Sequence, residues 1–250
     1  MSMHGERTPA AAVSKLRRQS DLRRPGFWRG VAREKLRDRS LTVLLIVQVL
    51  VLFVLVPGSA AGFRLPVAVP VTMLVVSMSS VIFLARQRWA MTAAIGLLAA
   101  TMVTFVARSG WPGREADIAH ALLVLATYAT LNYVIMGAVF GPGRVTAHRI
   151  RGAIVFYLNL GLMFSLIDHV VADMVPGAFS NLPPVTDRQS FAAAMTYYSF
   201  GTLTSLGSGD IMPVHPIARS LASMEAVIGQ LFPPTLLARI VTLELEHRRR

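Results

Sequence analysis

The chain has 250 residues, of which 54% are hydrophobic and 15% are charged, and its mean hydropathy is +0.54. So apolar a chain is hard to keep in water, which excludes an ordinary soluble domain and favours a membrane protein. Lys and Arg outnumber Asp and Glu by 25 to 13, and cysteine is absent. Disulfides and thiolate metal sites are therefore excluded.

Basic residues crowd the first 40 positions, as the stretch FWRGVAREKLRDRS at residues 27–40 illustrates. A basic tail can bind nucleic acid, but this one runs directly into apolar blocks and has no recognisable binding module, so we expect no nucleic-acid partner. We interpret residues 1–40 as a cytoplasmic N-terminal arm. Residues 27–40 suit a short interfacial helix on anionic lipid, and a solvated basic tail is the alternative.

A transmembrane helix needs about 20 apolar residues to cross about 30 Å of hydrocarbon. Runs of about this length recur at residues 41–57, 65–85, 89–107, 118–140, 151–171 and 216–243. They predict an all-α integral membrane protein with six transmembrane helices. Residues 41–143 form a four-helix scaffold in this interpretation. Residues 144–250 form a pore domain that contains a linker, the fifth helix, a pore loop, the sixth helix and a short basic tail.

The distribution of arginine predicts the orientation of these spans. Basic residues gather on the side that receives residues 1–40, 144–151 and 248–250, and the other side has few. The positive-inside rule then places both chain ends in the cytoplasm. The fourth span, residues 118–140, has no arginine, whereas a voltage sensor needs several charges in one span. We therefore expect no voltage-sensing helix.

A shorter apolar stretch separates the last two spans. Residues 190–204, SFAAAMTYYSFGTLT, are too few to cross a bilayer, which predicts a re-entrant pore helix. Non-helical backbone at membrane depth is tolerated where it lines a water-filled cavity, so the following residues 205–209, SLGSG, should line a pore. Glycine reaches backbone conformations that other residues resist, and a row of carbonyl oxygens can replace the hydration shell of an ion.

This region resembles the pore domain of the potassium channel superfamily, whose filter reads T-V-G-Y-G-D between a pore helix and an inner helix. The resemblance covers about residues 152–241. The glycines and the acid of the filter are retained as Gly207, Gly209 and Asp210. Three positions differ, because Thr, Val and Tyr of the family are replaced by Ser205, Leu206 and Ser208.

The resemblance implies a homotetramer around one central filter, with K⁺ as the permeant ion and no other cofactor. The K⁺ sites it implies are at Ser205, Leu206, Gly207 and Ser208, with Gly209 completing the filter. Support for the filter is implied at Thr204, Asp210, Tyr197 and Tyr198. Gly229 falls on the glycine hinge of the family's inner helix.

The two serine replacements in the filter have different consequences. Ser205 keeps the hydroxyl of the family's threonine, so we expect a small effect. Ser208 lacks the ring that braces the filter, unless Tyr197 or Tyr198 repacks to replace it. A softer filter predicts weak selectivity, so a weakly selective Na⁺/K⁺ channel is one alternative. A nonconducting channel-like scaffold subunit is another.

Two carboxylates and two prolines in the last spans also bear on function. Glu225 precedes Gly229 by one helical turn, and we expect it to brace the back of the pore helix through hydroxyl-bearing residues rather than to bind ions. Asp168 is expected to form a surface pair with His169 at the outer interface. Pro233 and Pro234 predict a kink in the sixth helix, which serves either as a gate or as a fixed bend.

The sequence as a whole predicts a passive channel for monovalent cations. We expect it in a bacterial inner or plasma membrane. The spans contain no paired acids, metal-ligand spacing or nucleophile motif that would support catalysis, so we do not expect an enzyme.

Overall fold

The computed structural model describes residues 41–61, 88–110, 113–140, 147–184 and 187–248. These residues belong to one compact unit, Ser40–Arg250. The predicted N-terminal arm and the predicted span at residues 65–85 lie outside the described residues.

The described part of the chain is mostly helical. Residues 41–60 are helical, with a π-helical segment in the middle. The elements in chain order are η1 (Val51–Leu55), α3 (Val56–Ala60), α5 (Arg88–Gly110), α6 (Arg114–Phe140), α7 (Ala147–Met174), β1 (Phe179–Ser180), α8 (Arg188–Leu203), β2 (Met212–Pro213) and α9 (Pro216–Arg248).

Four of these helices are long and apolar enough to cross a membrane, namely Leu41–Gly58, Arg114–Gly137, Arg149–Met174 and Pro216–Arg239. They correspond to the predicted first, fourth, fifth and sixth spans. The apolar part of α5, Met91–Ala107, is shorter. The prediction of a helical membrane protein is thus confirmed.

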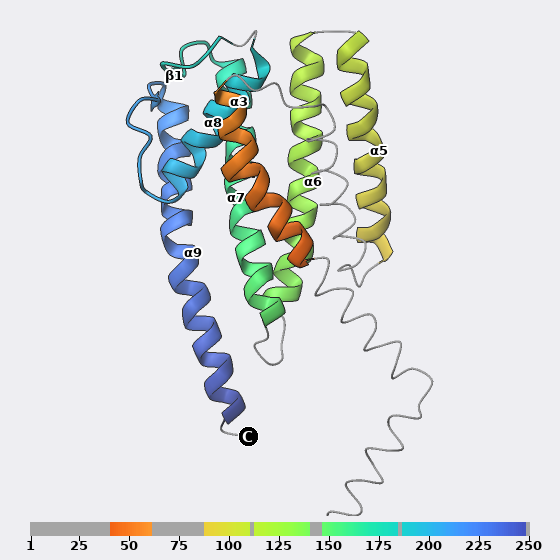
Figure 1. Cartoon of the computed structure of the whole chain (residues 1–250), viewed down its shortest axis with the longest axis vertical. Helices are drawn as coiled ribbons and strands as arrows, with labels where there is room; N and C mark the ends of the chain where they lie inside the picture. The colour runs from red at the N-terminus through yellow and green to blue at the C-terminus, as the bar shows by residue number, and fades with distance from the viewer. Residues whose placement is uncertain (1–40, 62–87, 111–112, 141–146, 185–186, 249–250) are drawn as a thin grey trace, which may run out of the picture. The chain divides into compact units, whose positions relative to one another are not determined.

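The long helices lie side by side in the order α5, α6, α7 and α9 (Figure 1), and each contacts the next. The short helix α8 lies near one end of α7 and α9 and contacts both, and α3 also contacts α8. α7 begins and α9 ends at the opposite end of the bundle (Figure 1). α7 is therefore the helix that joins the N-terminal part of the bundle to α8 and α9.

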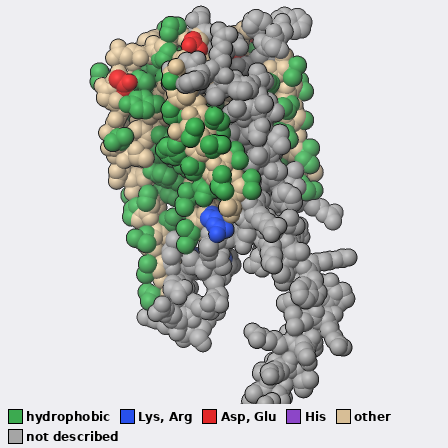
Figure 2. Space-filling model, viewed as in Figure 1, with side chains coloured by type: hydrophobic (Ala, Val, Ile, Leu, Met, Phe, Trp, Pro, Cys, Tyr) green, Lys and Arg blue, Asp and Glu red, His purple; other side chains and the backbone are tan. Residues whose placement is uncertain are grey.

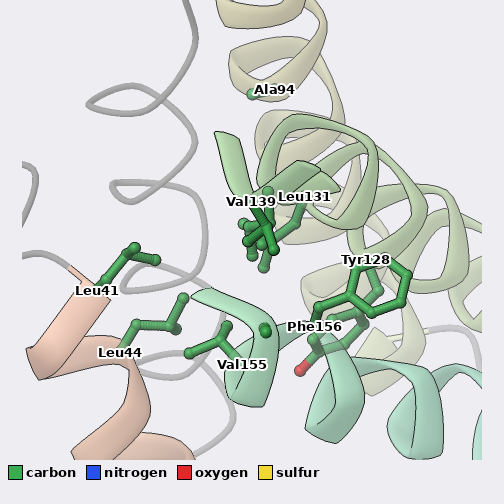
Figure 3. Packing of buried hydrophobic residues seen from close by; sticks show 10 residues of the cluster. Leu41, Leu44, Ala94, Tyr128, Leu131, Val139, Val155 and Phe156 are labelled. Carbon is green, nitrogen blue, oxygen red and sulfur yellow. The ribbon is translucent and has the colours of Figure 1, made fainter. Parts of the chain in front are cut away.

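The larger apolar core joins the first helix to α6 and α7. Leu41 and Leu44 extend toward Val155 of α7, and Val139 and Leu131 come from α6 (Figure 3). On the face that Figure 2 shows, hydrophobic side chains cover much of the described surface and charged ones are few. Large exposed apolar groups on several long helices fit a surface that contacts lipid, where the solvent is itself apolar.

The short helix predicted at residues 190–204 is observed as α8, which has 16 residues and is too short to cross about 30 Å of hydrocarbon. Its start is fixed by Asp187, whose Oδ1 accepts a hydrogen bond from the amide of Ser190 over 3.3 Å. A short antiparallel ladder beside it pairs Phe179 of β1 with Pro213 of β2. The ladder thereby joins the segment before α8 to the segment after it.

Two glycines let the neighbouring helices approach α8 closely. A Cβ atom on Gly161 of α7 would lie 2.7 Å from Cζ of Phe200, and a Cβ on Gly229 of α9 would overlap the carbonyl oxygen of Leu203. Gly229 therefore has a packing reason of its own, in addition to the hinge that the resemblance implies. Small residues at helix contacts are the usual way to achieve close packing within a membrane.

We predict that Gly229→Ala destabilises the protein, because its methyl group meets backbone that cannot rotate away. Overpacking of this kind costs about 1–3 kcal/mol. The measurement is the midpoint of thermal unfolding in one detergent. Gly137→Ala in α6 is the matched control, since a Cβ there meets no atom within 4 Å. Equal midpoints for the two variants would show that Gly229 is not in a tight contact.

Candidate functional site

The loop that follows α8 is held to the last turn of that helix by its own backbone amides. The amide of Ser205 donates to the carbonyl oxygen of Thr202 over 2.9 Å. The amides of Leu206 and Gly207 both donate to the carbonyl oxygen of Gly201, over 2.9 and 3.1 Å. Three successive amides of the loop therefore face α8.

The direction of these amides determines the direction of the preceding carbonyl groups. The described peptide bonds are all trans, and in a trans peptide the C=O points opposite to the N–H of the following residue. The carbonyl groups of Thr204, Ser205 and Leu206 consequently point away from the last turn of α8. The loop is exposed here, and Leu206 has 80% of its surface accessible. This row of oxygens is a suitable set of ligands for a dehydrated cation.

Backbone angles along the loop alternate in handedness. Ser205, Gly207 and Gly209 have φ of +56°, +77° and +74°, and Leu206 and Ser208 between them do not have positive φ. Glycine adopts positive φ without steric cost, which explains the two glycines. Ser205 is the exception, because a side chain is strained in this region. Sequence reasoning did not identify Ser205 as a left-handed residue.

Ser208 is held by side-chain contacts rather than by the main chain of α8. Its carbonyl oxygen accepts a hydrogen bond from the hydroxyl of Tyr197 over 2.8 Å. Its own hydroxyl donates to the carbonyl oxygen of Ile211 over 2.8 Å. Residue 208 is a tyrosine in the potassium channel superfamily. Here the hydroxyl of Tyr197, on α8, contacts the backbone of that residue.

Tyr198 points away from the loop, into a small core. It is 2% exposed and packs edge-on against Phe179, with ring centroids 5.2 Å apart. Ala178, Ile211 and Ala218 complete this core. The two adjacent tyrosines thus have different tasks, since Tyr197 contacts the loop and Tyr198 packs β1 against α8.

Asp210 ends the loop and is linked to the segment before α8. Its carboxylate Oδ1 accepts from the amide of Ile211 over 3.0 Å, and its carbonyl oxygen accepts from Nδ2 of Asn181 over 2.9 Å. Asn181 follows β1 and has φ of +57°. Sequence reasoning missed Asn181, and the signal available was weak, because asparagine tolerates left-handed backbone in many turns.

Glu225 of α9 is fully buried against α8. Its Oε1 lies 2.6 Å from the hydroxyl oxygen of Ser199, which also lies 2.7 Å from the carbonyl oxygen of Gly161 in α7. Ser199 therefore sits between α7 and α9. The contact is of the kind expected from the sequence, a glutamate against a hydroxyl group on the back of the short helix.

The prediction of a surface pair between Asp168 and His169 is wrong. Asp168 is fully buried, and neither carboxylate oxygen has a hydrogen-bond partner in the described residues. His169 lies instead 3.9 Å from the carboxylate of Asp173 and packs edge-on against Phe191. Adjacent residues of a helix point in directions about 100° apart. Asp168 therefore points into the bundle, whereas His169 is partly exposed.

The remaining predicted residues lie in regular helical surroundings. The hydroxyl of Thr204 donates to the carbonyl oxygen of Phe200 over 2.6 Å and so closes the end of α8. Pro233 and Pro234 lie inside α9, which is assigned as one helix through both of them. The described residues contain no group of three or more His, Cys, Asp or Glu that could hold a metal ion.

In this chain a short helix and an exposed backbone loop lie between two long apolar helices, α7 and α9. Pores of ion channels have this arrangement. Residues 153–245 match the family model described as Ion channel. The match covers less than half of the chain, and it supports a pore domain of the potassium channel superfamily in this segment. It spans α8, the loop and nearly all of α7 and α9. The comparisons with curated proteins and with solved structures gave no match.

We predict that Asn181→Gly loosens the loop without disturbing the helices. Glycine keeps the left-handed backbone of residue 181, so the variant loses chiefly the hydrogen bond to Asp210. A bond worth about 1 kcal/mol corresponds to about fivefold faster amide exchange by local opening. Hydrogen exchange with mass spectrometry measures this on a peptide covering residues 206–212. A peptide from α6 is the internal control, and unchanged exchange at residues 206–212 would contradict the prediction.

Proposed function

We propose that this chain forms a passive channel for monovalent cations, with K⁺ as the favoured ion. The observation that carries the proposal is the row of carbonyl groups at Thr204, Ser205 and Leu206, which point away from α8 because the loop amides face it. A cation that leaves water needs such oxygens in place of its hydration shell. The ion-channel match of residues 153–245 supports transport rather than catalysis.

A single loop supplies one wall of such a site, so the proposal includes a homotetramer with the four loops around a shared axis. The ion sites are proposed at Ser205, Leu206, Gly207 and Ser208 with Gly209, and the row of carbonyls adds Thr204 to this set. Support comes from Tyr197, Tyr198, Asp210 and Glu225. K⁺ is the permeant ion and the proposal needs no other cofactor.

The proposed topology has six spans, a re-entrant α8 and cytoplasmic chain ends in a bacterial inner or plasma membrane. The first helix ends and α5 begins at opposite ends of the bundle (Figure 1). A further crossing at residues 65–85 fits this arrangement. Residues 41–143 act as scaffold, residues 144–250 as the pore domain, and residues 1–40 as a basic arm that contacts anionic lipid. α6 has one arginine, Arg114, at its first residue, which supports a channel without a voltage-sensing arginine helix.

A specific observation favours weak selectivity as the second candidate. The carbonyl oxygen of Ser208 already accepts the hydroxyl of Tyr197, so fewer of its lone pairs remain for an ion. Because K⁺ over Na⁺ preference depends on the number and stiffness of coordinating oxygens, a filter with this departure discriminates less between the two ions.

We predict K⁺ flux from liposomes that contain the purified protein, and loss of that flux in Gly207→Ala. An alanine at φ of +77° is strained by about 1–2 kcal/mol, so the peptide groups on either side rotate. The assay is run with K⁺ and with Na⁺ gradients. Gly137→Ala, in open space on α6, is the control and should conduct normally. A silent wild-type protein would favour the nonconducting scaffold, and flux through Gly207→Ala would contradict a backbone filter.

We predict that Ser208→Tyr raises the preference for K⁺ over Na⁺, because a ring at residue 208 adds packing to the hydrogen bond from Tyr197 and stiffens the loop. Tyr197→Phe should change the preference too, since it removes the donor to the carbonyl oxygen of Ser208. Reversal potentials under bi-ionic conditions measure both effects. If the wild type is already as selective as Ser208→Tyr, the idea of a softened filter fails.

A further inference from the structure

The hydroxyl group of Ser199 lies between oxygen atoms of two other helices. Oε1 of Glu225 on α9 is 2.6 Å away, and the carbonyl oxygen of Gly161 on α7 is 2.7 Å away. Both distances are normal for O–H···O hydrogen bonds. Ser199 and Glu225 are fully buried, so water does not compete for these contacts.

A count of protons limits how both contacts can be made. A serine hydroxyl has one proton to donate, a carbonyl oxygen can only accept, and an ionised carboxylate can only accept. If Glu225 were ionised, one of the two acceptors would therefore lack a donor. If Glu225 carries a proton, it donates to Ser199, and Ser199 donates to Gly161. Only the protonated acid satisfies both contacts at once.

The charges around Glu225 favour the same state. Among the residues that the structure describes, the titratable groups that interact with it are Asp168 and Tyr157 on α7 and Tyr198 on α8. None of these groups carries a positive charge. Arg219, on the same helix as Glu225, is exposed and donates to the carbonyl oxygen of Pro213. A buried carboxylate without a cationic partner is strongly unfavourable.

The pair also lies where it can control the loop. Ser199 lies less than one helical turn before Gly201 and Thr202, whose carbonyl groups hold the loop amides. The two contacts of Ser199 tie this part of α8 to α7 and to α9. A shift of α8 would move the acceptors of the loop amides, and the row of loop carbonyls with them.

We propose that Glu225 and Ser199 are positioning residues for the filter, and that they act only while Glu225 is protonated. Loss of this proton removes the donor to Ser199 and leaves an unpaired charge between α8 and α9. The native state is weakened by this buried charge and the unfolded chain is not, so the free energy of unfolding should fall as the pH rises. The effect on conduction rests on the proposed channel function, whereas the proton on Glu225 and the effect on stability do not.

The experiment compares wild type, Glu225→Gln, Glu225→Ala and Asp168→Asn across a neutral to alkaline pH series. The three measurements are K⁺ flux from liposomes, the thermal unfolding midpoint in detergent, and the infrared band of protonated carboxyl groups. An amide at residue 225 still donates to Ser199 but cannot ionise. Asp168→Asn is the matched control, since it removes the other buried acid of this region.

The wild type should lose both flux and thermal stability as the pH rises. Glu225→Gln should lose this pH dependence, and Glu225→Ala should be impaired at every pH. The infrared band should lose one component in Glu225→Gln, and that component should persist in Asp168→Asn. The same pH dependence in Glu225→Gln as in wild type would overturn the proposal, and so would a band that disappears in Asp168→Asn alone.

Two further outcomes keep the test decisive. If Glu225→Gln does not assemble, Ser199→Ala replaces it, and the carboxyl band should shift because its hydrogen-bond partner is gone; an unshifted band contradicts the proposal. If no variant conducts at any pH while the stability profiles behave as expected, the channel function fails and the protonated pair stands.

Discussion

The carbonyl oxygen of Gly201 accepts hydrogen bonds from two loop amides, Leu206 and Gly207, and the course of the loop depends on this contact. The last carbonyl groups of any helix lack partners within the helix. Here α8 uses one of them to fold the following backbone against itself. A Cβ on Gly201 would lie 3.3 Å from the amide nitrogen of Ser208, so a side chain there would press on the returning backbone. The carbonyl groups of the loop are then left facing the other way.

The position of α8 is in turn set by two helices that approach it through small residues. Apolar side chains gain little from association within lipid, because lipid tails are as apolar as they are. Close backbone contact and buried polar contacts have to supply the specificity instead. Gly161 and Gly229 allow the approach, and the hydroxyl of Ser199 links both sides. The stack of Tyr157 on Phe232, with centroids 5.6 Å apart, adds an aromatic contact between α7 and α9.

Features that depend on local chemistry could be predicted from the sequence. Span lengths follow from runs of apolar residues, and the short helix follows from residues 190–204 being too few to cross. Gly207 and Gly209 have positive φ, a backbone conformation that glycine adopts without steric cost. Features that depend on contacts between distant residues could not be predicted. No local pattern shows that Tyr197 turns to the loop while Tyr198 turns to Phe179, or that Asn181 reaches Asp210.

The wrong prediction for Asp168 has the same cause, because its burial depends on contacts between distant residues. A carboxylate near the end of an apolar span has the lowest free energy at the membrane surface, where water solvates it. Its burial depends on the rotation of α7, which is fixed by Gly161 meeting Phe200 and by the other contacts along the helix. Sequence gives the periodicity of a helix but not its rotation about its own axis when apolar residues surround it, as they do in a membrane.

The two halves of the loop are held by different means, and this separates two properties of the proposed channel. Main-chain hydrogen bonds to α8 orient Thr204, Ser205 and Leu206, and no side chain takes part in these bonds. Side chains from Tyr197 and Asn181 hold the backbone at Ser208 and Asp210. Substitutions can therefore alter the stiffness of the second half while the first half keeps its geometry. Permeation, which needs a row of oxygens, then depends on the first half, and the choice between K⁺ and Na⁺ depends on how rigidly the second half completes it.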